Sequence, residues 1–245
     1  MNKLFAIVFV GICSVFAQQA GESVIYKVDG KDYEGYYVSP GKNAPLVMII
    51  HDWDGLTGYE VKRAGMLLKQ GYAAFAVDMF GKGVRPTKID DKKKLTGALY
   101  ADREKMRLLM EGGLDAAKSK GANVKNAVAI GYCFGGSCIL EWARAGVELK
   151  ALISFHGALS SPQGQDFANV KGQVLVFHGT ADRSVPMSDF AQLADDLENA
   201  DVRHEMTTYS SAPHAFTVFG SDRYREGADK KSWRRFMVFL ENELK

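Results

Sequence analysis

Five predominantly apolar runs recur along the chain, and each has the length of a β-strand. They are Leu46–Ile50, Ala73–Val77, Ala127–Ile130, Ala151–Phe155 and Val174–Phe177. A strand with one face in water would alternate apolar and polar residues, whereas these runs are apolar at nearly every position. We therefore expect strands that are buried on both faces, as in a parallel sheet covered by helices.

The segments between and after these runs carry apolar residues at helical spacing. The pattern extends over 61–68 before Gly71, over 100–120, and over 233–244 near the end of the chain. Apolar residues three and four apart form one face of a helix, and Gly71 stands where a helix would end. Strands that alternate with helices predict an α/β fold, with a mostly parallel central sheet and helices on both faces.

Two alternating segments precede the first apolar run. Ser23–Val28 and Tyr33–Val38 flank the dipeptide Asp29-Gly30, which is a frequent two-residue hairpin turn. We expect an antiparallel β-hairpin at one edge of the sheet. No linker rich in Pro, Gly or Ser interrupts the chain after this point, so we expect residues 18–245 to form a single domain.

Residues 1–17 have the organisation of a secretory signal peptide. Lys3 precedes the apolar run Leu4–Ile12, which is shorter than the ~20 residues that span a bilayer. Small or compact side chains then lie at Val15 and Ala17, as at a cleavage site. A lipoprotein anchored at Cys13 is the alternative, although the bulky isoleucine before it disfavours that modification. We expect an exported protein, periplasmic or secreted, with no stable membrane association after cleavage.

Charge and motif content exclude several classes of function. The formal net charge is +2, from 31 basic and 29 acidic residues, which gives no electrostatic footprint for nucleic acid. No Cys or His pair has metal-ligand spacing, and no glycine-rich loop has a phosphate- or dinucleotide-binding pattern. We therefore expect a monomer that acts on a small molecule without a metal, a cofactor or a nucleic-acid partner.

A strand-to-helix turn with a central cysteine follows the third apolar run. Its sequence is Gly131-Tyr132-Cys133-Phe134-Gly135-Gly136. This is the nucleophile-elbow pattern, with Cys where Ser is usual, and its glycines allow backbone segments to approach closely in a sharp turn. The thiol would lie at a helix N-terminus, which favours a negative charge. The alternative is a buried cysteine in an ordinary glycine-rich turn.

Two further residues complete the order expected of a catalytic triad. Asp182 follows the fifth apolar run, and His214 lies between a strand-like stretch at 202–209 and the last predicted helix. The order nucleophile, acid, base is that of α/β-hydrolases. Asp182 could instead cap a helix that begins near Pro186. Because three separate positions agree, we favour Cys133, Asp182 and His214 as a triad.

Three other histidines each follow an apolar run. They are His51, His156 and His178. They could line the pocket, but we favour hydrogen bonding within the core for each of them.

The chain resembles the dienelactone hydrolase family along essentially all of the predicted mature protein. The matching segments are His51–Leu56, Gly71–Ala74, Val77–Phe80, Gly131–Gly136, Gly179–Asp182 and His214–Phe216. The Gly-Tyr-Cys-Phe-Gly-Gly segment is the most specific of them, because most α/β-hydrolases carry Ser at its centre. The resemblance implies an α/β-hydrolase fold with Cys133 as nucleophile, Asp182 as acid and His214 as base.

The resemblance also implies the groups that surround the thiol. The oxyanion hole would use the backbone N–H groups of Trp53 and Phe134. Asp52 would be the acidic residue that orients the resting thiol, although well-known members carry the longer Glu there. The dienelactone-specific members hold a substrate carboxylate with two arginines, and this chain has Lys82 and Val218 at those places. The hydrolase chemistry is therefore expected here, but the dienelactone substrate is not.

We expect a hydrolase that cleaves a small ester, lactone or thioester through an acyl-cysteine intermediate. Phe80 and Phe216, together with Trp53, would shape an apolar substrate pocket near Lys82. We interpret 92–94, three consecutive lysines, as a solvated loop face that could also steer anions. Two alternatives stay open: a weakly active or inactive ligand-binding protein on a hydrolase scaffold, and a redox protein that uses the free thiol.

The signal-peptide pattern makes a prediction about the mature N-terminus. Because Lys3, the apolar run and Ala17 follow one another as in a cleaved signal, we expect exported protein to begin at or near Gln18. N-terminal sequencing of exported material measures this directly, and a sequence that still begins at Met1 would contradict it.

Overall fold

The computed structural model describes residues 21–245, so the predicted signal peptide at 1–17 lies outside the described residues. The strands are β1 Glu22–Val28, β2 Lys31–Val38, β3 Pro45–Ile50, β4 Ala73–Val77, β5 Asn123–Tyr132, β6 Ala151–Phe155, β7 Gln173–Gly179 and β8 His204–Tyr209. The helices are α1 Gly58–Leu68, α2 Ile89–Ala101, α3 Arg103–Ser119, α4 Phe134–Arg144, α5 Met187–Asn199 and α6 Glu226–Leu244.

The strands form one 8-stranded sheet in the order β1-β2-β4-β3-β5-β6-β7-β8. The strands from β4 to β8 in this order run parallel, whereas β2 is antiparallel to both β1 and β4. The hairpin turn has φ of 48° at Asp29 and 74° at Gly30, and two positive φ values are what a tight two-residue hairpin turn requires. The predicted mostly parallel sheet with an edge hairpin is therefore confirmed.

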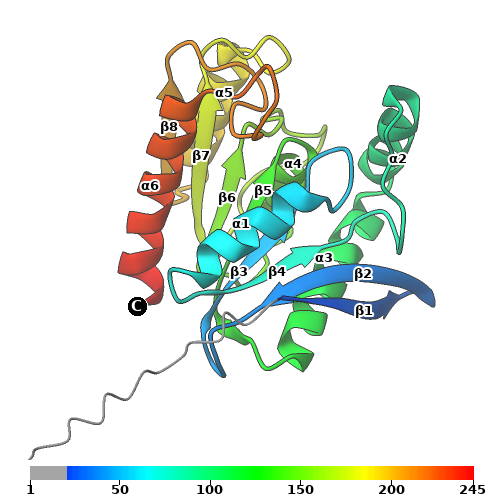
Figure 1. Ribbon diagram of the computed structural model, residues 1–245. Coiled ribbons are helices and arrows are strands. Elements are labelled where there is room, and N and C mark those ends of the chain that lie inside the picture. The colour runs from blue at the N-terminus through cyan, green and yellow to red at the C-terminus, as the bar shows by residue number, and fades with distance from the viewer. Residues whose placement is uncertain (1–20) are drawn as a thin grey trace, which may run out of the picture.

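Helices cover both faces of the sheet, as the apolar runs predicted. In β3, Leu46, Met48 and Ile50 pack on one face, and Val47 and Ile49 pack on the other. The first face is covered by α3, α4 and α5, and the second by α1 and α6. Figure 1 shows α1 and α6 in front of the sheet, with the carboxyl ends of the parallel strands at the top. This upper edge is where loops from different strands meet.

The region 88–120 differs from its prediction. The three lysines at 92–94 belong to α2 and not to a loop, and α2 and α3 are separate helices. The break falls at Asp102, whose backbone leaves the helical conformation and whose side chain accepts a hydrogen bond from Lys105 N at 2.9 Å. Only Thr96 and Leu99 of α2 are buried, so its apolar face is too narrow to give a helical pattern among the charged residues. Figure 1 shows α2 standing at one side of the sheet.

Backbone segments approach closely at the turn between β5 and α4. A Cβ atom at Gly135 would lie 2.2 Å from the carbonyl oxygen of Ile50, and one at Gly131 would lie 2.1 Å from the carbonyl oxygen of Gly135. No side chain can occupy such positions without a shift of backbone. The turn also holds Cys133 at φ 51° and ψ −112°, outside the conformations that ordinary residues favour. The glycines therefore permit a sharp turn that raises Cys133 above the sheet.

Alanine substitution tests this steric account. Gly135→Ala should lower the free energy of unfolding by about 2 kcal/mol or more, because the new methyl group must displace the end of β3. Gly65→Ala in α1 is the matched control, since a Cβ there meets nothing within 4 Å and alanine favours a helix by roughly 1 kcal/mol. Urea denaturation measures both variants, and equal stability of the two would contradict the account.

Candidate active site

Three predicted residues from separate loops meet above the carboxyl edge of the sheet. Cys133 follows β5, Asp182 follows β7 and His214 follows β8. The Nε2 atom of His214 lies 3.1 Å from the Cys133 Sγ atom, and its Nδ1 atom lies 2.8 Å from Asp182 Oδ2. The two ring nitrogens are thus both engaged. The arrangement orients one imidazole between a thiol and a carboxylate, as nucleophilic catalysis requires.

The loop after β7 holds the Asp182 carboxylate in place. Its Oδ1 atom accepts hydrogen bonds from the backbone N–H groups of Ser184 at 2.8 Å and Val185 at 3.0 Å. The other oxygen is left for His214. Helix α5 has Pro186 at its N-cap position and no side-chain cap, so Asp182 does not cap it. The alternative interpretation of Asp182 as a helix cap is therefore wrong.

Electrostatic coupling within this trio shifts the protonation of its members. Burial alone would lower the pKa of His214, but its hydrogen bonds to Asp182 and Cys133 outweigh burial and raise that pKa to about 10. Burial would raise the pKa of Asp182, yet the bond to His214 lowers it. His214 therefore holds a proton at neutral pH and can stabilise a negative charge on the sulfur that it contacts.

A cavity of about 240 Å³ opens at the thiol. Its walls are Trp53, Thr96, Tyr100, Cys133, Phe134, Ser137, Ala158, Ser184, Val185 and His214. Aromatic and aliphatic groups dominate, with a few hydroxyl groups among them. A space of this size can take a small organic molecule or a small part of one.

The sequence and the fold have close counterparts among known proteins. The family model described as "Dienelactone hydrolase family" matches residues 33–244. The chain belongs to the dienelactone hydrolase family. It is therefore an α/β-hydrolase that acts on esters or lactones.

Relatives and structural neighbours agree with this membership. A candidate carboxymethylenebutenolidase of Salmonella typhimurium is 24% identical over 224 residues, which is 86% of this chain and 83% of the relative. A dienelactone hydrolase-like promiscuous phosphotriesterase from metagenomic libraries superposes with a TM-score of 0.85 at 26% identity. A structure titled m3DLH superposes with a TM-score of 0.86, also at 26% identity. Both structures cover 92% of this chain and 98% of their own.

Three residues predicted for the substrate pocket do not line this cavity. The Phe80 ring packs on the His51 ring at 4.7 Å and on the Phe134 ring at 5.7 Å, measured between ring centroids, and it is not among the residues that line the cavity. Phe216 is fully buried against His156, and Lys82 is exposed on the turn that follows β4. The position of a residue after a strand does not fix the direction of its side chain, which is why these assignments failed.

Helix α2 supplies pocket residues that the sequence did not reveal. Thr96 and Tyr100 lie one turn apart on α2, and both line the cavity with Cys133. Residues four apart lie on one face of a helix, so the spacing of Thr96 and Tyr100 could have indicated a shared face. The charged residues around them obscured this pattern in the sequence. Lys92, one turn earlier, pairs with Asp54 at 3.8 Å, so α2 also contacts the loop that carries Trp53.

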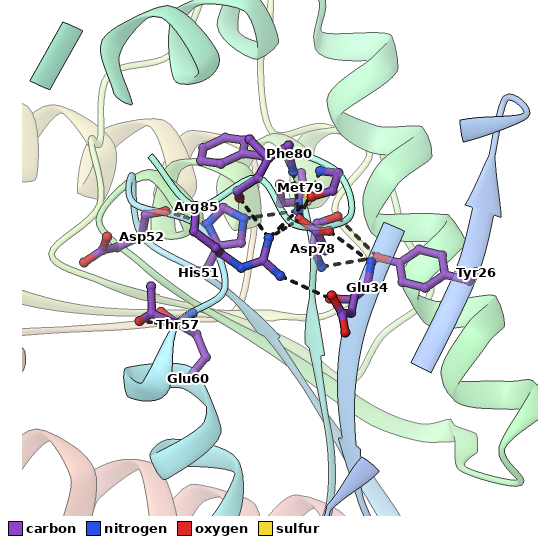
Figure 2. Close-up of polar contacts among 12 residues, drawn as sticks. Tyr26, Glu34, His51, Asp52, Thr57, Glu60, Asp78, Met79, Phe80 and Arg85 are labelled. Atoms are coloured by element: carbon purple, nitrogen blue, oxygen red, sulfur yellow. Dashed lines mark hydrogen bonds and ion pairs between the residues drawn. The ribbon is translucent and has the colours of Figure 1, made fainter. Parts of the chain in front are cut away.

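The Trp53 loop is held by the residues before it rather than by contact with the thiol. His51 is fully buried, and its Nδ1 atom lies 2.5 Å from the Asp52 carbonyl oxygen. Its Nε2 atom accepts a hydrogen bond from Met79 N at 3.1 Å. Figure 2 shows His51 between Asp52 and Met79. Burial lowers the pKa of His51 to about 4, so the ring stays neutral and keeps one donor and one acceptor.

Asp52 does not orient the thiol in this structure. Its carboxylate accepts a hydrogen bond from Asp54 N at 3.2 Å, and within residues 21–245 it makes none to Cys133. Burial raises the pKa of Asp52 to about 9. A side chain one methylene shorter than Glu turns back on its own loop, so the thiol contact expected from the family is not made within residues 21–245.

A second polar cluster fixes the loop after β4. The buried Asp78 carboxylate accepts backbone hydrogen bonds from Glu34 at 3.0 Å and from Phe80 and Gly81 at 3.1 Å. Arg85 approaches the same carboxylate at 3.4 Å (Figure 2). These contacts join β2 to the loop whose Met79 N–H group holds His51. The edge hairpin thereby supports the wall of the cavity that carries Trp53.

Residues 21–245 contain neither a membrane-spanning helix nor a cluster of metal-binding side chains. Within that range no helix combines the length and the apolar character needed to cross a membrane. Over the same part of the chain, no group of three or more His, Cys, Asp or Glu side chains is arranged to hold a metal ion.

Proposed function

We propose that this dienelactone hydrolase-like enzyme cleaves a small ester, lactone or thioester through a Cys133–His214–Asp182 triad and an acyl-cysteine intermediate. The observation that supports the proposal most directly is the continuous contact from Sγ through the imidazole to the carboxylate, at 3.1 and 2.8 Å. A redox role of the thiol would not require His214 or Asp182 in this arrangement.

In the first half-reaction the Cys133 thiolate attacks the substrate carbonyl carbon and a C–S bond forms. The carbonyl oxygen becomes an oxyanion, which the backbone N–H groups of Trp53 and Phe134 stabilise. One such donor lowers the activation free energy by about 3–4 kcal/mol. The tetrahedral species collapses, and the bond to the leaving oxygen or sulfur breaks. His214 gives that leaving group its proton.

In the second half-reaction water releases the acyl group. Neutral His214 takes a proton from the water as its oxygen attacks the thioester carbon. The C–S bond breaks, the carboxylic acid product departs, and the protonated imidazole again faces the thiolate. Asp182 remains ionised throughout and stabilises the imidazolium. The cycle consumes one water for each bond cleaved and needs no cofactor.

Substitutions in the triad test the roles separately. Cys133→Ala should lower kcat by roughly 10⁴-fold or more, and His214→Ala by a similar factor, because the pair acts as a unit. Asp182→Asn should lower kcat by a smaller factor than either of these. Cys133→Ser should leave reduced activity, because a hydroxyl needs a stronger base than a thiol does. Kinetics on a chromogenic ester measure all four variants.

Cys138, in the helix that follows Cys133, supplies a control for a general loss of structure. Cys138 is fully buried in α4, so Cys138→Ala should change stability and leave turnover intact. Iodoacetamide should label Cys133 in proportion to lost activity, and substrate should protect that residue. Full activity in Cys133→Ala, or labelling at Cys138 alone, would contradict the proposed mechanism.

The cavity and its surroundings predict the charge of the substrate. Lys82 is exposed away from the cavity, and Val218 carries no charge where the family has its second arginine. We expect preference for neutral or singly charged small esters and weak turnover of dienelactone. A panel of short esters and lactones, each with and without a carboxylate, measures kcat/KM. Carboxylate-bearing lactones as the best substrates by far would refute this prediction.

A further inference from the structure

A chain of buried polar side chains lies behind the triad and takes no part in the mechanism above. It consists of His156, Thr217, Tyr59, Arg63 and Asp229, which come from the residue after β6, the loop after β8, α1 and α6. His156, Thr217 and Arg63 are fully buried, and Asp229 is 4% exposed. Burying so many polar groups is costly unless each is paired, and an apolar core could stabilise the fold as well. We therefore expect this chain of polar side chains to have a role other than stability.

One end of this chain reaches the nucleophile. The backbone N–H group of Cys133 points at His156 Nδ1 at 3.1 Å and shares its hydrogen with the Phe155 carbonyl oxygen, also at 3.1 Å. An N–H group can only donate, so Nδ1 of His156 is the unprotonated nitrogen. The proton of the neutral ring then lies on Nε2. Burial, and next the charge of His214, lower the pKa of His156 and keep the ring neutral.

The same ring reaches the loop that carries the base. The His156 Nε2–H group donates to the Thr217 hydroxyl at 2.8 Å, and Thr217 lies three residues after His214. The two imidazole rings also pack edge to face, with centroids 5.5 Å apart. His156 thus contacts the backbone of the nucleophile, the ring of the base and the loop of the base.

The far end of the chain anchors Thr217 to the helices. The Thr217 hydroxyl lies 2.7 Å from the Tyr59 hydroxyl, which accepts a hydrogen bond from Arg63 Nε at 3.2 Å. Arg63 also donates to the Thr217 carbonyl oxygen at 3.1 Å and pairs with Asp229. Both the side chain and the main chain of Thr217 are therefore fixed by α1, which α6 holds in turn.

We propose that His156 and Thr217 are positioning residues that hold the nucleophile elbow and the His214 loop at one fixed separation. This inference rests on the proposed triad. The Sγ–Nε2 contact joins residues 81 positions apart, on two loops that could otherwise move independently. The neutral His156 ring links those loops directly. Reacting groups must be held within fractions of an ångström, so loosening this link should slow the chemical step while substrate binding persists.

The Thr217→Val and Thr217→Ser pair tests the link with matched shapes. Valine has the shape of threonine but no hydroxyl, so Thr217→Val should lower kcat about tenfold and change KM by less than about twofold. The pH midpoint of iodoacetamide labelling at Cys133 should move upward, because a loosened His214 stabilises the thiolate less. Thr217→Ser keeps the hydroxyl and should restore kcat to within about twofold of wild type.

A buried hydroxyl outside the link supplies the control. Ser232 is fully buried in α6 and donates to the Asp229 carbonyl oxygen at 3.0 Å. Ser232→Ala should leave both kcat and the labelling profile unchanged. Should Thr217→Val fail to fold, Tyr59→Phe removes the neighbouring hydrogen bond that holds the Thr217 hydroxyl in place for His156, and it should lower kcat in the same direction.

The outcomes separate this inference from the proposed mechanism. Unchanged kcat and labelling in Thr217→Val would overturn the positioning role, and so would an equal loss of kcat in the Val and Ser variants. In either case, an inactive Cys133→Ala would still support the triad. Unchanged kcat in a folded Tyr59→Phe, where Thr217→Val cannot be made, would overturn it as well. An active Cys133→Ala would refute the triad itself, whatever the Thr217 variants did.

Discussion

The close approach of the β5–α4 turn to the end of β3 is the constraint on which the site depends. With only 2.2 Å between a hypothetical Cβ of residue 135 and the Ile50 carbonyl oxygen, the chain can pass there only as glycine. The turn forces Cys133 to φ 51°, a conformation that costs on the order of 1–3 kcal/mol in a non-glycine residue. The fold accepts this strain, and the thiol stands above the sheet where the loops after β7 and β8 can reach it.

Once the sulfur is fixed, the surrounding groups divide into two supports. On one side, His51 and the Asp78 cluster hold the loop of Trp53, so the edge hairpin supports the cavity wall that carries Trp53. On the other side, His156 and Thr217 join the elbow to the loop of His214. Both supports use a neutral, buried histidine with one donor and one acceptor. Such a ring can hold two backbone segments in register without adding charge beside the reacting atoms.

The sequence predicted those features that a local pattern encodes. Strands buried on both faces appear as apolar runs, and the glycines around Cys133 appear because no other residue fits the turn. The order of Cys133, Asp182 and His214 follows from the positions of loops after strands, and these three residues do meet. What failed depends on side-chain direction: Phe216 is buried in the core, and the half-buried Phe80 packs against His51 and Phe134. Thr96 and Tyr100 were missed because α2 presents a narrow apolar face among charges. The His156–Thr217 contact spans 61 positions, so no local pattern could reveal it.

Capture of the acyl-enzyme is the most direct test of the central claim, that Cys133 is the nucleophile. Enzyme mixed with an excess of an activated ester and quenched during the burst of the first turnover should gain the mass of one acyl group per chain. Peptide mapping should place that group on Cys133, and hydroxylamine should remove it, as it removes thioesters. An acyl group on any other residue, or turnover with no thioester on Cys133 during the burst, would contradict it.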